Sequence, residues 1–179
     1  MIPFKINNYN HMKSKILITV MLLFGFMAGI IFTAVTISVS SGEMLVKEFK
    51  SPYDFDKTVT VMSERINAKD GWHVTGIIDQ NKEVQAHGGY AIGNFKIIKY
   101  CHGGFAAEML KSDDRKKTGT MMPKSFAVYE KSDGQVFVST MNGAVIGKLF
   151  GGEIERIIEE SSLEVESMMR FINLKYTLF

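Results

Sequence analysis

The sequence predicts one α+β domain, an antiparallel sheet with helices on one face, preceded by a single N-terminal transmembrane helix. Three observations lead to this prediction. Residues 16–39 form a long run without a charged side chain. The remainder shows the patterns of a strand, a helix, four strands and a helix, and an Asp-Gly turn joins the last two strands. This order is typical of a β-α-β(4)-α unit whose helices are segregated to one face of its sheet.

The apolar run at residues 16–39 is long enough to cross a membrane. As a helix it would extend about 36 Å, whereas the hydrocarbon core of a bilayer is about 30 Å thick. The alternative is a cleaved signal peptide, which has a shorter apolar region of about 7–15 residues and a small-residue cleavage site. No A-x-A pattern follows the run, although small residues at 36–40 leave cleavage open. We therefore expect an uncleaved anchor in the lipid bilayer.

Basic residues flank this run only on its N-terminal side. Lys5, Lys13 and Lys15 precede it, and no acidic residue does. Because basic flanks stay in the cytoplasm, we expect residues 1–15 to be cytoplasmic and residues 40–179 to form a periplasmic domain, with the run in a bacterial inner membrane. A lipoprotein is not indicated, since no cysteine lies near the run.

Gly25 and Gly29 lie four residues apart within the run. This Gly-x-x-x-Gly spacing lets two membrane helices approach closely, so the face is a candidate for helix packing in a homodimer. The alternative is that glycine is simply common in membrane helices.

The elements of the exported part follow from hydrophobic periodicity and turn signals. One helical stripe runs through Phe55, Val59, Met62 and Ile66. Polar segments indicate a loop at 79–93, where Asp79 caps a turn, and a solvated turn at 111–117. We expect strands at 44–50, 72–78, 94–100, 124–130 and 135–140, and helices at 54–68, 104–111, 143–150 and 153–174.

Charge and motifs exclude several classes of function. The whole chain has a net charge of +2, but three of its 21 basic residues precede the apolar run, and all 19 acidic residues follow it. The part after the run therefore has 21 − 3 = 18 basic and 19 acidic residues, a net charge of −1. A nearly neutral domain lacks the basic footprint of a nucleic-acid binder. Motifs for c-type haem attachment, zinc, nucleotide phosphates and the hydrolase nucleophile elbow are all missing. No catalytic activity is evident.

One group of residues has the chemistry of a soft metal site. Cys101 and His102 end a predicted strand where a helix begins, and Met121 and Met122 precede the next strand. Thiol, imidazole and thioether ligands suit copper(I) or haem iron. The alternative is structural, because a single cysteine at a strand end is usually a small core residue and methionine fills gaps. This alternative needs no cofactor.

Several segments resemble the domain of unknown function 302 family. The resemblance covers residues 44–172 and is carried by Ser51-Pro52-Tyr53-Asp54-Phe55 and by the segments 72–79, 99–101, 122–142 and 147–152. It implies a β-α-β(4)-α fold that often forms dimers, and no settled activity. Members of the family often have a second cysteine where this chain has Lys124, and a histidine where it has Gln80.

Together these observations favour a membrane-anchored periplasmic domain that binds a protein partner or ligand, such as an accessory subunit of a membrane complex. The main alternative is a redox, haem- or copper-handling domain using Cys101 and His102 with Met121 or Met122. An enzyme with Cys101 as its nucleophile is a third hypothesis. The sequence predicts no nucleic-acid partner.

Overall fold

The computed structural model of the protein describes residues 6–172, and it describes the surroundings of side chains at 13–33, 42 and 44–172. The chain forms two compact units, Met1–Gly42 and Glu43–Phe179, which we describe separately.

The first unit is formed by the helix α1 (Ile6–Leu45), which continues through the first residues of the second unit. Its segment Lys13–Thr33 has 21 residues, a mean hydropathy of 2.5 and no buried side chain. This helix is long and apolar enough to cross a membrane, as an anchor or a signal sequence would be. Lys5, which contributed to the predicted orientation, lies outside the described residues.

The second unit contains a five-stranded antiparallel sheet in the order β1-β5-β4-β3-β2. Its strands are β1 (Val46–Lys50), β2 (Trp72–Asp79), β3 (Phe95–His102), β4 (Lys124–Glu130) and β5 (Val136–Met141). The predicted α+β class with an antiparallel five-stranded sheet is confirmed. The first strand is shorter than expected, because Met44 and Leu45 belong to α1.

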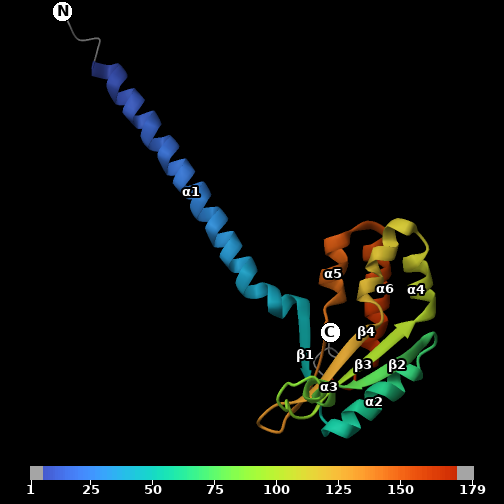
Figure 1. Ribbon diagram of the computed structural model, residues 1–179. Coiled ribbons are helices and arrows are strands. Elements are labelled where there is room, and N and C mark those ends of the chain that lie inside the picture. The colour runs from blue at the N-terminus through green and yellow to red at the C-terminus, as the bar shows by residue number, and fades with distance from the viewer. Residues whose placement is uncertain (1–5, 173–179) are drawn as a thin grey trace, which may run out of the picture. The chain divides into compact units, whose positions relative to one another are not determined.

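One face of the sheet forms the core with two of the helices of this unit (Figure 1). Ile98, Phe126, Val128 and Val138 alternate along the three inner strands of that face, and each is fully buried. The helix α2 (Phe55–Asn67) covers them with the stripe predicted from the sequence, and α6 (Gly152–Met168) covers them with Val165 and Met168. Two shorter helices, α4 (Gly103–Leu110) and α5 (Gly143–Phe150), pack against α6.

Three segments differ from the sequence-based prediction. The expected loop at 79–93 contains a helix, α3 (Gln80–Ala86), which was missed because none of its residues is buried and it therefore has no apolar stripe. Asp79 does cap it, as its carboxylate accepts the Lys82 N–H at 3.1 Å. Of the expected turn at 111–117, residues 113–117 belong to a 3₁₀ helix, η1 (Asp113–Met121). The last helix ends at Met168 instead of continuing to residue 174, and residues 173–174 lie outside the described part.

Candidate functional site

A cavity of about 420 Å³ lies between one end of the sheet and the helices α4, α5 and α6. Its walls are mostly apolar and include Trp72, Met109, Ile146 and Ile157. Pockets of roughly 300–1,000 Å³ with apolar walls and a few polar groups are typical of small-molecule sites. The cavity therefore has the size and lining of a ligand site.

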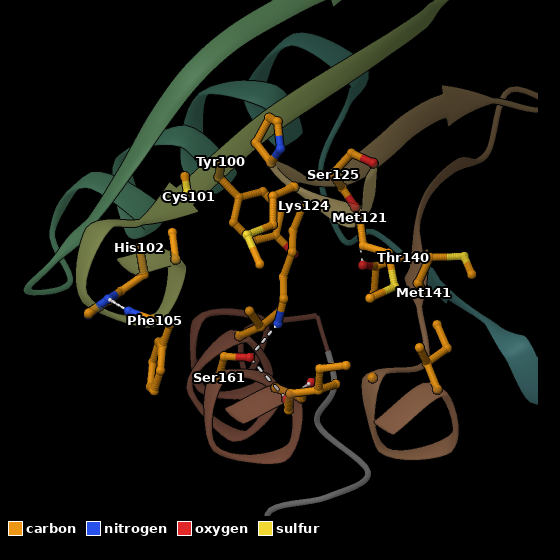
Figure 2. Close-up of a pocket in the computed structure, with 18 of the residues that line it drawn as sticks. Tyr100, Cys101, His102, Phe105, Met121, Lys124, Ser125, Thr140, Met141 and Ser161 are labelled. Carbon is orange, nitrogen blue, oxygen red and sulfur yellow. Dashed lines mark hydrogen bonds between the residues drawn. The ribbon is translucent and has the colours of Figure 1, made fainter. Parts of the chain in front are cut away.

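Lys124 extends into this cavity from the first residue of β4 (Figure 2). It is directly opposite Tyr100 in the register of the sheet, and so belongs to the face that forms the core. Its Nζ donates a hydrogen bond to Ser161 Oγ of α6 at 2.7 Å and lies 5.9 Å from the centre of the Trp72 ring. Within the described residues, no carboxylate oxygen lies within 4.0 Å of this ammonium.

Burial changes the acid–base properties of Lys124. Removal from water disfavours the charged amine and lowers the pKa of Lys124 to about 8, although negative charge on the Cys101 sulfur would act in the opposite direction. The side chain keeps partial exposure towards the cavity. Burial also raises the pKa of its neighbour Tyr100, which therefore stays a neutral phenol.

Charge around the cavity is predominantly positive. Among the residues that the structure describes, its lining includes three lysines, Lys47, Lys99 and Lys124, but only one carboxylate, Glu166. Glu166 is paired with Lys47 at 2.8 Å. The cavity thus offers a cationic group, Lys124, that an anionic ligand could neutralise.

His102 serves the fold at the junction of β3 and α4. Its Nδ1 accepts the backbone N–H of Phe105 at 3.1 Å, so the imidazole caps α4. The ring also packs edge-on against Trp72, with ring centroids 5.2 Å apart. On its other side the ring lies against Gly71, where a Cβ would come within 2.2 Å of Nε2. These contacts fix the imidazole.

The structure brings all four predicted soft ligands, Cys101, His102, Met121 and Met122, to the lining of one cavity. Cys101 and His102 are consecutive strand residues, however, and consecutive strand side chains point to opposite faces. Figure 2 shows Cys101 directed away from the Lys124 ammonium. Met121 and Met122 pack beside the apolar cluster formed by Met109, Ile157 and Ile158. Their assignment to haem or copper stays a prediction.

Sequence reasoning missed the group that dominates this cavity. In the sequence, Lys124 stands out only as a departure from the family pattern, and no motif includes Ser161. A signal was present, because Lys124 precedes Phe126 and Val128 at a spacing of two and therefore shares their core-facing side of the strand. A lysine in that register is a departure from the apolar pattern of a buried strand face.

These features define a class of protein: an α+β domain with an antiparallel sheet and an apolar cavity that contains a lysine. Within that class, the chain belongs to the family described as "Domain of unknown function DUF302", which matches residues 47–172. Among solved structures, it is similar to the "uncharacterized conserved protein DUF302 from Bacillus stearothermophilus". That similarity has a TM-score of 0.63 at 15% identity and covers 72% of this chain and 98% of the other. At this identity the likeness shows the fold alone. No curated protein sequence matches the chain.

Proposed function

We propose that this protein is a membrane-anchored periplasmic domain that binds a small apolar molecule with an anionic head, and that the head pairs with Lys124. The observation that carries the proposal is the ammonium of Lys124 in an apolar cavity without a carboxylate partner among the described residues. An ammonium has three N–H donors, and within the described part of the chain only one of them has an acceptor, Ser161 Oγ. A ligand carboxylate would accept from the remaining donors.

The apolar walls define the rest of the ligand. A chain or ring would replace water against the partly buried apolar residues of the lining, among them Phe105, Met122 and Ile146. Burying apolar surface contributes about 25 cal/mol per Å², so the body of the ligand supplies affinity. The head supplies selection, because a buried lysine without a counter-ion favours an anion over a neutral group of the same shape.

The anchor is part of this proposal. The segment Lys13–Thr33 suits a membrane span by length and hydropathy, and Lys13 and Lys15 at its start support a cytoplasmic N-terminus in the bacterial inner membrane. In that arrangement residues 40–179 would be held in the periplasm, next to a source of apolar molecules. Protease protection in sealed inside-out and right-side-out vesicles would test this orientation.

Gly25 and Gly29 support helix pairing within the anchor. Among the described residues, a Cβ built at either position meets no atom within 4 Å, and small residues at this spacing let two membrane helices approach closely. A homodimer, or an accessory subunit of a membrane complex, would use this face of the helix. Replacing both glycines with leucine should weaken crosslinking between copies if a dimer forms here.

Octanoate binding by the full chain in phosphatidylcholine nanodiscs tests the ligand, with 1-octanol as its neutral analogue and empty nanodiscs as the blank. A hydrogen-bonded charge pair is worth about 1.5–3 kcal/mol, so octanoate should bind roughly 10- to 100-fold more tightly than 1-octanol. Lys124→Met should abolish this preference, whereas Lys99→Met, at the lining of the same cavity, should keep it. Equal binding of octanoate by the wild type and Lys124→Met would contradict the proposal.

The haem or copper alternative has a separate test. Absorption spectra and metal analysis of the protein with and without Cys101→Ala would detect a bound chromophore or metal that depends on the thiol. A metal lost with that substitution would favour the alternative over ligand binding at Lys124.

A further inference from the structure

The amine of Lys124 is positioned to act as a nucleophile as well as a charge. Ser161 Oγ accepts one of its N–H groups at 2.7 Å, and the Ser161 hydroxyl donates its own hydrogen to the Ile158 carbonyl at 3.0 Å. The serine thus holds the amine through an N–H group. The lone pair of a neutral amine would therefore stay free.

The surroundings of this amine favour the reactive form. No described carboxylate oxygen lies within 4.0 Å to hold it as an ammonium ion. Desolvation in an apolar pocket is a recognised way to activate a lysine. With the pKa of Lys124 near 8, about a fifth of the amine is neutral at pH 7.4, compared with roughly one in a thousand for an ordinary lysine.

We propose that Lys124 forms a reversible Schiff base with an apolar aldehyde or ketone that enters the cavity. The inference rests on the proposed binding of apolar molecules in this cavity, and it names a second group of ligands, carbonyl compounds, that the same side chain would take. Lys47 also lines the cavity, but its ammonium is paired with Glu166 at 2.8 Å, which makes it the less suitable amine.

The reaction balances without an oxidant or reductant. The Nζ lone pair attacks the carbonyl carbon and forms a C–N bond, while the carbonyl oxygen takes up a proton to give a carbinolamine. The nitrogen then gives up its second amine proton, its lone pair forms the C=N bond as the C–O bond breaks, and the two amine protons leave with the oxygen as water. The product is an imine between Lys124 and the former carbonyl carbon, and added water reverses the step.

The other titratable groups that line the cavity are Lys47, Lys99, Tyr100, Cys101, His102 and Glu166. Of these, the Cys101 thiol is the competing nucleophile. Reduction distinguishes the two products, because cyanoborohydride converts an imine into a stable secondary amine and leaves a thiohemiacetal to dissociate. The trapped position therefore reports the amine.

The test incubates the full chain in phosphatidylcholine nanodiscs with octanal and sodium cyanoborohydride at pH 7.4, followed by peptide mass spectrometry. Limiting octanal should place one octyl group on Lys124, at least ten times faster than on any other lysine. Lys124→Arg keeps the positive charge but should lose this label. Lys99→Arg removes a neighbouring amine and should keep it. Labelling spread evenly over the lysines of the wild type would overturn the inference.

Octanoate binding separates this inference from the proposed function. If octanoate binds through Lys124 while octanal does not label it, the Schiff base is wrong and anion binding stands. If Lys124 is labelled selectively and octanoate shows no preference over 1-octanol, the Schiff base is supported and the anionic head is wrong. If neither occurs, both proposals fail.

Discussion

Lys124 Nζ and Ser161 Oγ lie 2.7 Å apart and join β4 to α6 across one end of the core. The serine is almost completely buried, with 3% of its surface exposed, and it also donates to the Ile158 carbonyl. Strand and helix therefore meet at this point through a charged hydrogen bond, whereas Phe126 of β4 and Val165 of α6 belong to the same apolar core. Loss of a hydrogen bond to a buried charge is costly, so substitutions at this pair should change the stability of the protein as well as the candidate site.

Replacing Ser161 with alanine should destabilise the protein through Lys124. The ammonium would lose its only hydrogen-bond acceptor among the described groups, at a cost of about 1–3 kcal/mol at pH 7. In a Lys124→Met background the same substitution should cost much less, because no charge remains to be satisfied. Chemical unfolding of the four proteins gives the coupling energy. A cost of Ser161→Ala that is equal in both backgrounds would show that the two side chains act independently.

Lys124→Met should stabilise the protein at neutral pH, and the gain should disappear in alkali. The folded-state pKa of about 8 lies below the ordinary value of 10.5, so the unfolded chain binds more protons between these two pH values. Wild-type stability due to this group therefore rises with pH across the window from about 8 to 10.5. Allowing for partial exposure, we expect Lys124→Met to gain on the order of 2 kcal/mol at pH 7. Near pH 10.5 the difference should be close to zero.

Thermal unfolding of both proteins from pH 7 to pH 10.5 measures this difference, and Lys99→Met is the matched control. A constant difference between the wild type and Lys124→Met over the whole range would mean that the charge of Lys124 is not destabilised by the fold.

Much of the fold could be predicted from the sequence because its signals are local. The stripe of Phe55, Val59, Met62 and Ile66 predicted α2, and Asp133-Gly134 predicted the turn between β4 and β5. The missed helix α3 buries no residue, so periodicity carried no information about it. Its only signal was the capping residue Asp79.

The site depends on pairing between distant segments, which periodicity does not report. Ser161 lies 37 residues after Lys124, and only the packing of α6 on the sheet brings the two together. Cys101 and His102 were conspicuous in the sequence because of their chemistry. At the end of β3, His102 caps the helix α4. The side chains of Cys101 and His102 point to opposite faces of the sheet, because the two residues are consecutive in the strand. Lys124 was less conspicuous, because lysine is ordinarily an exposed residue.

Substitution of His102 should distinguish a helix cap from a metal ligand. His102→Ala removes the acceptor for the Phe105 N–H and should cost about 1 kcal/mol of stability. His102→Asn offers a side-chain oxygen that can accept the same hydrogen bond, so it should recover most of that loss. Urea unfolding of the three proteins, with and without a chelator, provides the measurement. A contrary result has two parts: His102→Asn lowers stability as much as His102→Ala does, and the chelator lowers the stability of the wild type to that of the variants. His102 would then bind a metal instead of capping α4.

Octanoate affinity should decrease as pH rises above about 8. The carboxylate is ionised throughout this range, but Lys124 loses its proton above its pKa of about 8. Above that pH, binding of the anion requires Lys124 to take up a proton again, which lowers the observed affinity. The affinity should fall by up to about tenfold per pH unit until the higher pKa of the complex is reached. Lys124→Arg provides the control, because a guanidinium stays charged to beyond pH 12 and should bind octanoate equally at pH 7 and pH 9.5. Calorimetric titration of both proteins in nanodiscs at several pH values measures the slope. An affinity of the wild type that is independent of pH between 7 and 9.5 would mean that the anion is held by a group other than Lys124, and the lining lysines Lys47 and Lys99 would be the next to substitute.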